Sequence, residues 1–289
     1  MKAPGYTALK GLAYAACEPL MRRASRAYVP GPQCADALHW ARHQAPKGVN
    51  FTFGYFNAEG ESSAEVEAGC TQAIHALALL PDGYCSVKAP ALSYDADALR
   101  RLAAQAAAHG QGLHFDSHGP ETASPTLAAL AKLRPGHPRL GLTLPGRWCR
   151  SLEDASWAAA HGLRVRVVKG QWPCPESAHV DPRKGFLAVI DRLAGQVEEA
   201  AVATHDAALA LEAARRLRAR GTRCELELLC GLPRAAVMRL AREATLPVRM
   251  YIPFGQAWLP YALGQVLRQP RLWPRLLKDS LAESWQAGA

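Results

Sequence analysis

The segment that decides the fold begins with Leu163-Arg164-Val165-Arg166-Val167-Val168-Lys169-Gly170 and continues to Tyr261. Its first apolar run ends in Lys169-Gly170, and later runs in the segment also end beside polar residues. These are Ala203-Thr204-His205-Asp206, Glu225-Leu226-Glu227-Leu228-Leu229 and Arg249-Met250-Tyr251-Ile252-Pro253-Phe254-Gly255. In an α/β barrel the carboxyl ends of all strands open onto one face. The polar side chains are therefore expected to converge there.

The rest of the chain repeats this alternation of short β-rich runs and segments with apolar residues at helical spacing. The candidate strands are residues 50–56, 83–88, 112–116, 139–144, 163–168, 200–203, 223–229 and 247–252. The clearest helical segments are residues 65–80, 97–109, 186–197 and 207–220. Such alternation predicts parallel strands joined by right-handed crossovers. We expect an α/β protein with a closed (β/α)8 TIM-type barrel over residues 48–289, preceded by a helical N-terminal extension over residues 1–47.

An open, doubly wound sheet is the alternative architecture. Such sheets usually carry a glycine-rich, phosphate-binding turn after the first strand. Here the first candidate strand leads into Asn57-Ala58-Glu59-Gly60-Glu61, which has a single glycine and two acids. That turn would repel a phosphate, so the closed barrel is favoured.

Composition narrows the class of protein. The chain has 289 residues, of which 49% are hydrophobic and 20% charged, as in a soluble globular protein with a large core. No run approaches the ~20 apolar residues that a membrane-spanning helix needs. The eight cysteines include no Cys-x-x-Cys pair and the ten histidines no ligand-like cluster, so no metal site is expected. Scattered cysteines are typical of reduced thiols in a cytoplasmic protein.

The net charge of +9 comes from dispersed arginines and lysines rather than from a basic stripe. Nucleic-acid binding is therefore not expected. The positive charge is compatible with anionic substrates and with peripheral contact to the inner face of a membrane.

Several strand-end residues need partners. Lys88 ends the second candidate strand and must pair with an acid or meet an anion, because a lysine buried alone in a barrel mouth is costly. Asp116 ends the third candidate strand and could be that acid. Arg166 needs a planar anionic or carbonyl partner, which suggests a cofactor. Glu225 and Glu227 share one face of a strand, so both must be paired or used. The structural alternatives are that the Lys88 side chain reaches solvent and that Asp116 is a helix cap or a loop acid.

Thr204-His205 brings a hydroxyl and an imidazole to the sixth strand end, a combination suited to a phosphate. A histidine with a purely structural role is the alternative. Tyr251 and Tyr261 flank the last strand-to-helix loop and could wall a small pocket.

Together these segments resemble the proline dehydrogenase family, including the equivalent domain of the bifunctional proline-utilisation flavoenzymes. Residues 165–170 match the family's Arg-Leu-Val-Lys-Gly, and residues 203–206 match Ala-Thr-His-Asp/Asn. Residues 249–255 match Arg-x-Tyr-Val-Pro-Tyr-Gly, and residues 258–261 match Trp-Tyr-Pro-Tyr. Weaker matches, such as Ser86-Val87-Lys88, keep the same order along the chain.

The resemblance implies FAD laid across the carboxyl face of the barrel. The residues that it places on the cofactor are Arg166, Val168, Lys169, Gly170, Thr204, His205 and Glu227. The residues that it places at the substrate in catalytic or binding roles are Lys88, Asp116, Tyr251 and Tyr261. The implied reaction moves a hydride from L-proline, or a related cyclic or secondary amine, to the flavin and leaves an imine (1-pyrroline-5-carboxylate from proline). Electrons then pass to a quinone or another acceptor, as in proline catabolism.

The chain departs from the family where the substrate carboxylate is bound. The family has Tyr-x-x-Arg-Arg at the start of the last helix, whereas this chain has Tyr261-Ala262-Leu263-Gly264-Gln265. Arg268 lies one helical turn beyond Gly264 and is the candidate substitute for substrate binding. A family glutamine after the fourth strand is Pro145 here, and another on the seventh strand is Glu227.

The chain thus keeps most of the motifs that bind the flavin in the family and lacks most of those that bind the substrate carboxylate. This combination leaves alternative functions open. The chain could be a divergent paralogue that oxidises a different amine or none. A lyase or aldolase using Lys88 or Lys169 as a Schiff-base amine is a second class of function. A non-catalytic binding protein that keeps the barrel is a third.

Overall fold

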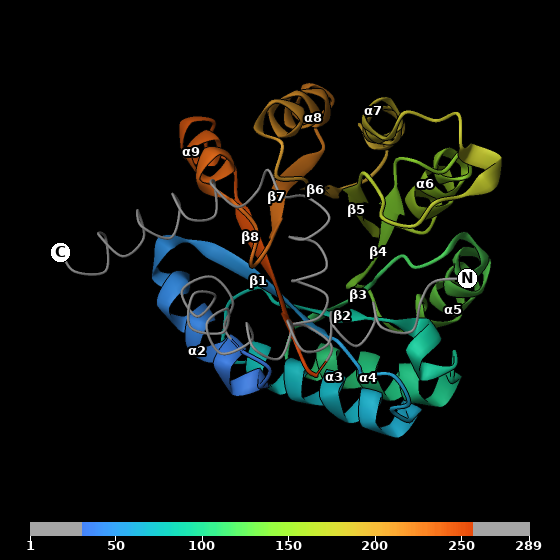
Figure 1. The fold of residues 1–289 in the computed structure, drawn as a ribbon, viewed down its shortest axis with the longest axis vertical. Coiled ribbons are helices and arrows are strands. Elements are labelled where there is room, and N and C mark those ends of the chain that lie inside the picture. Colours follow the sequence, from blue (N-terminus) through green and yellow to red (C-terminus); the bar gives the residue numbers. More distant parts are fainter. Residues whose placement is uncertain (1–30, 257–289) are drawn as a thin grey trace, which may run out of the picture.

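The computed structural model describes residues 31–256, in which strands and helices alternate along the chain (Figure 1). The strands are β1 Val49–Tyr55, β2 Tyr84–Val87, β3 Gly112–Phe115, β4 Leu140–Pro145, β5 Arg164–Val168, β6 Glu199–Ala203, β7 Arg223–Leu229 and β8 Val248–Phe254. The helices are α2 Cys34–Gln44, α3 Ser63–Leu77, α4 Ala96–Ala108, α5 Ala123–Leu133, α6 Ser151–Ala160, α7 Pro182–Leu193, α8 Ala207–Ala219 and α9 Ala235–Glu243. Short 3-10 turns are η1 Ala45–Lys47, η2 Ala89–Leu92, η3 Pro120–Thr122 and η4 Pro175–Ser177.

The strands form a closed parallel barrel in chain order, in which β8 pairs with β1. The predicted (β/α)8 barrel is therefore confirmed, and each candidate strand corresponds to one observed strand. Strand β8 continues to Phe254, beyond the predicted end at Ile252. The extension follows from its partner, because β1 and β8 pair along their full length, from Val49↔Val248 to Tyr55↔Phe254.

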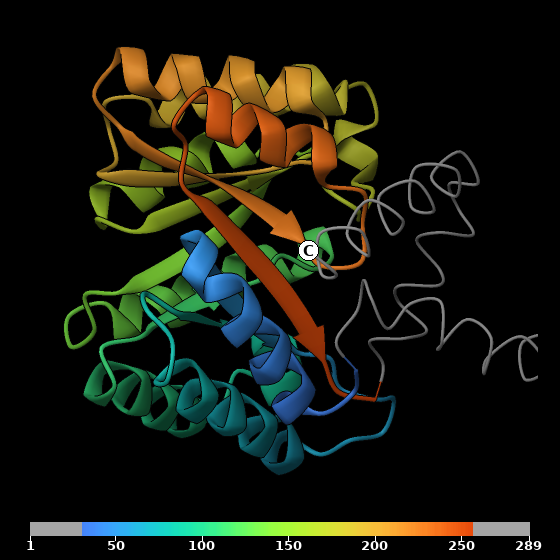
Figure 2. The ribbon, with the colours of Figure 1, turned by 90° about the vertical axis from the view of Figure 1, so that its left-hand side faces the viewer.

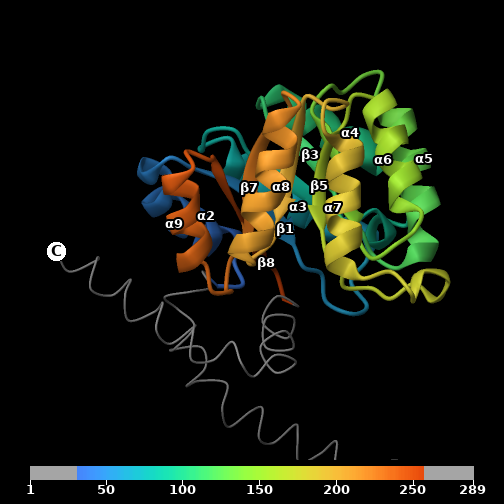
Figure 3. The same cartoon turned by 90° about the horizontal axis from the view of Figure 1, so that it is seen from above.

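The hydrophobic core lies between the outer face of the barrel and the surrounding helices. Strand residues that point outward, such as Val165, Val167, Leu226 and Leu228, are fully buried there. Helices α6 and α7 pack on β5, and α8 packs on β6 and β7. Helix α8 does so with a stripe of leucines and alanines while its arginines face solvent, as an amphipathic helix should. Figure 3 shows α6, α7 and α8 standing side by side around this part of the barrel.

Helix α2 packs on the outside of the barrel against β8, β1 and α3. Figure 2 shows it lying along β8. The Gly255 amide donates a hydrogen bond to the Pro32 carbonyl oxygen (2.8 Å), which ties the start of the described chain to the end of β8. Within residues 31–256, none of the helices combines the length and apolar character required to cross a membrane.

The inside of the barrel is polar and charged rather than apolar. Arg164 and Arg166 of β5 point inward, as do Glu225 and Glu227 of β7, and all four are buried. Strand β6 lies between them and presents small residues, since Ala201 pairs in register with both Arg166 and Glu225. The small alanine side chains leave room for the arginines and glutamates to meet across β6.

Candidate active site

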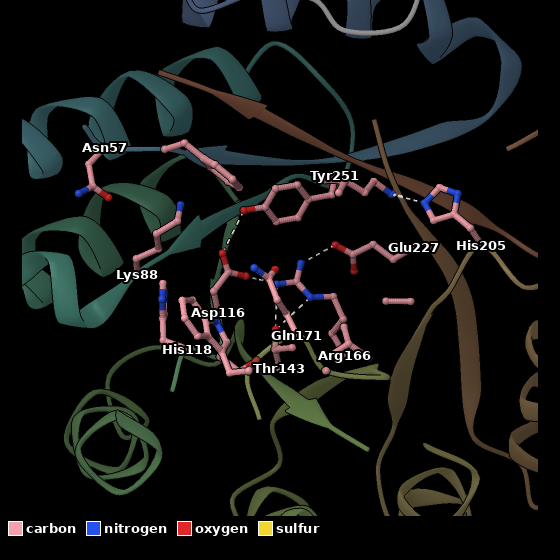
Figure 4. Close-up of a pocket in the computed structure, with 17 residues that line it drawn as sticks. Asn57, Lys88, Asp116, His118, Thr143, Arg166, Gln171, His205, Glu227 and Tyr251 are labelled. Atoms are coloured by element: carbon pink, nitrogen blue, oxygen red, sulfur yellow. Dashed lines mark hydrogen bonds and ion pairs between the residues drawn. The ribbon is translucent and has the colours of Figure 1, made fainter. Parts of the chain in front are cut away.

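A cavity of about 520 Å³ opens at the carboxyl ends of the strands. Every strand of the barrel contributes to its lining, either from its carboxyl half or from just beyond its end. This volume lies within the range of about 300–1,000 Å³ that is common for small-molecule sites. The polar groups at the strand ends thus surround one cavity, shown in Figure 4.

Most of the predicted site residues surround this cavity. Those in its lining are Lys88, Asp116, Arg166, Val168, Gly170, His205, Glu227 and Tyr251. Lys169 is exposed and Thr204 is buried, and neither lines the cavity. Tyr261 and Arg268 lie outside the described residues, as do Gly264 and Gln265.

Arg166 forms the charged floor of the cavity. Its Nη1 donates to Glu227 Oε1 (2.7 Å), its Nη2 to Asp116 Oδ1, and its Nε to Thr143 Oγ1 (3.0 Å). The guanidinium also lies 5.1 Å from the Tyr251 ring centroid. Burial opposes the charged form, but the Glu227 and Asp116 carboxylates outweigh it and raise the pKa of Arg166. The partners of this arginine are thus carboxylates of the protein itself.

Below Arg166, charges of alternating sign continue through the barrel. Arg164 Nη2 donates to Glu227 Oε2 (3.0 Å) and to Glu225 Oε1. Arg249 Nε in turn donates to Glu225 Oε1 (2.7 Å). Burial opposes ionisation of Glu227, yet attraction to Arg166 and Arg164 lowers its pKa to about 2. The expectation that both inward-facing glutamates are paired is confirmed. We call the whole set the charge ladder; its members are Asp116, Arg166, Glu227, Arg164, Glu225 and Arg249.

Asp116 is held on both of its oxygens. Oδ1 accepts hydrogen bonds from Ser86 Oγ (2.8 Å) and from Arg166, and Oδ2 accepts one from the Tyr251 hydroxyl (3.0 Å). The ion pair considered between Asp116 and Lys88 does not form: within residues 31–256, the cation that pairs with Asp116 is Arg166. Arg166 takes its place because β5 carries it into the barrel beside Thr143, within reach of the carboxylate.

Lys88 lies on the wall of the cavity. Its Nζ donates to the Tyr55 carbonyl oxygen and lies 3.9 Å from the centroid of the Phe56 ring. Burial lowers the pKa of Lys88, while the nearby Asp116 carboxylate acts in the opposite direction. The ammonium is therefore enclosed by an aromatic ring and one carbonyl rather than by a carboxylate.

His205 is tied to the protein through both ring nitrogens. Nδ1 donates to the Pro233 carbonyl oxygen (2.7 Å), and Nε2 accepts from the Leu229 amide (3.1 Å). Burial, the largest cause, lowers the pKa of His205 to about 4, so the ring is neutral at neutral pH. Both ring nitrogens are therefore used within the protein, as in the alternative of a histidine with a structural role. Thr204 has a similar local role, since its Oγ1 accepts from the Asp206 amide (3.2 Å).

One side of the cavity is built by two loops that brace each other. Arg147 in the loop after β4 donates through its backbone amide to Lys169 O (3.1 Å) and through Nη1 to Gln171 O (3.1 Å). Trp148 Nε1 donates to Trp172 O (2.9 Å). Gly170 stands between these contacts with φ +98°, a conformation that residues with a side chain rarely adopt. These contacts fix the path of the wall between β5 and α7.

Sequence reasoning missed His118, which lines the cavity after β3. Its Nε2 is buried and has no hydrogen-bond partner within residues 31–256. The ring lies 6.4 Å from the ring of Trp172, centroid to centroid. The sequence feature that could have pointed to His118 is its position two residues beyond Asp116 at the end of a strand. The segment has no periodic pattern that would have marked it further.

The comparisons with known proteins agree with the motifs. No family model matches the chain. The chain is 28% identical over 222 residues to a proline dehydrogenase of Deinococcus radiodurans, covering 69% of each chain. It is 23% identical over 270 residues to proline dehydrogenase 1 of Bacillus subtilis subsp. natto, covering 86% of this chain and 88% of the relative. The resemblance to the proline dehydrogenases is thereby confirmed.

Solved structures share the fold. One is proline utilization A from Bdellovibrio bacteriovorus inactivated by N-propargylglycine, with a TM-score of 0.76 and 17% identity over the whole of this chain and 36% of that one. A mutant of proline utilization A from Bradyrhizobium japonicum gives a TM-score of 0.67 and 18% identity, covering 84% of this chain and 30% of that one. The chain thus spans about a third of the length of these structures.

Proposed function

We propose that this chain, a relative of the proline dehydrogenases in sequence and fold, is an FAD-dependent oxidoreductase that oxidises L-proline or a related secondary amine to an imine. The observation that carries the proposal is the position of Arg166. It stands at the floor of the strand-end cavity, held by Glu227 and Asp116, in the segment that matches the family's Arg-Leu-Val-Lys-Gly. Lys88 and Tyr251, which the resemblance assigns to the substrate, lie beside it in the same cavity.

The residues of the cavity fit a flavin. Nη1 of Arg166 has an acceptor for only one of its hydrogens within residues 31–256, which leaves a buried donor for a ring nitrogen or carbonyl oxygen of a cofactor. Val168, Ala203 and Leu229 supply apolar surface for a planar ring system. Lys169, exposed at the end of β5, offers a cation for a phosphate group. When bound, the flavin supplies the hydride acceptor.

The chain's own residues would bind and orient the substrate. The hydrogen bonds to Asp116 fix the Tyr251 hydroxyl, so both groups are positioned before the substrate arrives. The Lys88 ammonium offers a positive charge in the same cavity. Glu227 neutralises part of the charge of Arg166 and holds its guanidinium in one orientation. We also propose a quinone or another electron acceptor as the final recipient of the electrons.

Filling the cavity tests the cofactor proposal. Ala203 ends β6 and lines the cavity, so Ala203→Trp should place an indole where the flavin would lie. Ala219, exposed at the end of α8, provides the matched control Ala219→Trp. Titration of FAD by its fluorescence should show at least about tenfold weaker binding for Ala203→Trp than for the wild type and the control. Equal binding by all three proteins, or no binding by the wild type, would contradict the proposal.

A Schiff-base reaction is the second candidate function, because burial lowers the pKa of Lys88 and so favours a neutral, nucleophilic amine. The Nζ would condense with a substrate carbonyl and release water, and borohydride would reduce the resulting imine to a stable amine. Mass spectrometry after borohydride treatment with pyruvate should then show an adduct on the wild type and on Lys169→Met, but not on Lys88→Met. Absence of any adduct would exclude pyruvate imine formation and favour the flavin reaction.

A further inference from the structure

Among the described residues, the charged side chains in the cavity lining balance each other. The cations are Lys88 and Arg166, and the carboxylates are Asp116 and Glu227. The lining also holds histidines that burial keeps neutral at neutral pH by lowering their pKa, namely His118 and His205. The family has a glutamine where this chain has Glu227. With glutamine there, the same lining would carry an excess positive charge, so Glu227 sets the balance.

Glu227 acts on the cavity from inside the barrel. Its Oε1 accepts from Arg166 Nη1 (2.7 Å) and its Oε2 from Arg164 Nη2 (3.0 Å), as Figure 4 shows for the first of these contacts. The side chain is only 1% exposed, so solvent and salt screen its charge little. Burial opposes its ionisation, but the arginines lower the pKa of Glu227 to about 2. The carboxylate is therefore a fixed negative charge beneath the cavity at neutral pH.

The charges beyond the lining are paired as well. Arg164 also contacts Glu225 and Glu199, and at the far end of the barrel Arg249 pairs with Asp82. Glu199 and Asp82 are partly exposed, so solvent screens them. The deeper part of the charge ladder thus supplies no surplus cation that would replace the charge that Glu227 cancels.

A flavin gains negative charge when it is reduced. The neutral ring system that accepts a hydride takes up two electrons and one proton, and it remains an anion until a second proton arrives. A net positive charge beside the ring stabilises this reduced form, whereas a carboxylate in the same place disfavours it relative to the oxidised form. The effect is stronger in a buried site than in water, because the dielectric constant is lower there.

We propose that the Glu227 carboxylate lowers the reduction potential of the bound flavin by cancelling the positive charge that Arg166 contributes to the floor of the cavity. The inference rests on the proposed function and adds how its driving force is divided between the two half-reactions. Transfer of the hydride from the amine to the flavin becomes less favourable than it would be with the family's glutamine. Transfer of electrons from the reduced flavin to the acceptor becomes more favourable by the same amount.

The midpoint potential of the bound flavin tests this proposal. It is measured on the full chain loaded with FAD, by anaerobic titration against redox dyes, for the wild type, Glu227→Gln and Glu225→Gln. The last variant is the matched control. It makes the same chemical change on the same strand and also breaks a buried contact with Arg164, but Glu225 does not line the cavity.

Glu227→Gln should bind reduced FAD at least about tenfold more tightly, relative to oxidised FAD, than the wild type does. For a two-electron couple this corresponds to a midpoint potential about 30 mV higher. Glu225→Gln should raise the potential less, because a charge farther from the ring interacts more weakly with it. A purely structural role would weaken the binding of both forms equally and leave the potential unchanged. An unchanged or lower potential in Glu227→Gln, or an equal rise in Glu225→Gln, would overturn the proposal.

A further variant covers the case in which Glu227→Gln does not fold. Asp116→Asn removes the other carboxylate that Arg166 contacts, so it should shift the midpoint potential in the same direction. An unchanged potential in Asp116→Asn would overturn the account of a balanced floor. A wild type that binds no FAD would contradict the proposed function itself, whereas bound FAD with an unshifted potential in the variants would overturn only this inference.

Discussion

Glu227 and Arg166 meet inside the barrel, with Glu227 Oε1 2.7 Å from Arg166 Nη1 and both side chains almost completely buried. The pair joins the cavity above to the rest of the charge ladder below. Arg164 contributes the second cation to Glu227, through a contact of 3.0 Å. Removal of one charge from the charge ladder leaves its neighbours buried with less opposite charge beside them.

Glu227→Gln should therefore destabilise the protein. The substitution keeps the shape of the side chain but leaves Arg164 and Arg166 with less compensation. Breaking a buried pair costs about 3–5 kcal/mol, and because the amide oxygen can still accept a hydrogen bond, we expect a loss of about 3 kcal/mol. Urea denaturation measures it. Glu199→Gln, which alters the half-exposed partner of Arg164, should cost less than about 1 kcal/mol, and equal losses would contradict the ladder.

The same pair predicts how stability depends on pH. Attraction to the arginines lowers the pKa of Glu227 to about 2 from an ordinary value of 4.5. Because the folded pKa is depressed, this contribution is fully present above pH 4.5 and is lost as the pH falls towards 2. The difference in unfolding free energy between wild type and Glu227→Gln should narrow over that interval. A difference that stays constant would contradict the lowered pKa.

Much of the architecture could be predicted because it depends on local pattern. Each strand is an apolar run that ends beside a polar residue, and parallel pairing brings these ends to one face. The polar pairing inside the barrel was only partly predictable. The alternation Arg164-x-Arg166 opposite Glu225-x-Glu227 is visible in the sequence, and the need to pair the acids follows from it. Their partners depend on Ala201, which leaves space across β6.

The candidate site was harder to predict in detail. Whether Asp116 pairs with Lys88 or Arg166 depends on how far each side chain reaches into the barrel, and sequence spacing does not encode this. His205 was recognised as a strand-end residue, but its bonds to Leu229 and Pro233 come from the end of β7 and the loop after it, more than 20 residues along the chain. His118 follows a strand in an irregular segment, so no periodic pattern marks it.

Gly54 makes room for Tyr251. A Cβ atom on Gly54 would lie 2.1 Å from the Tyr251 hydroxyl oxygen, so Gly54→Ala should push the tyrosine away from Asp116. We expect a loss of about 1–3 kcal/mol in unfolding free energy, together with weaker substrate binding. Gly136→Ala is the control, since its nearest neighbour is a backbone oxygen 4.0 Å away. Unchanged substrate binding in Gly54→Ala would argue against a role for the Tyr251 hydroxyl.

Restoring the family's arginine pair tests whether its loss limits the binding of the substrate carboxylate. Turnover of L-proline at low concentration should rise on Gly264→Arg with Gln265→Arg, because a charge-assisted hydrogen bond contributes about 1.5–3 kcal/mol. No gain in turnover would count against the loss of the arginine pair as the cause of weak proline binding.

The most direct test of the proposed function is the visible absorption spectrum of the purified, FAD-supplemented protein, recorded without oxygen before and after L-proline is added. The account predicts a bound-flavin spectrum that bleaches when the flavin takes the hydride. A protein that binds no FAD, or a bound flavin that stays oxidised with L-proline and with other secondary amino acids, would contradict it.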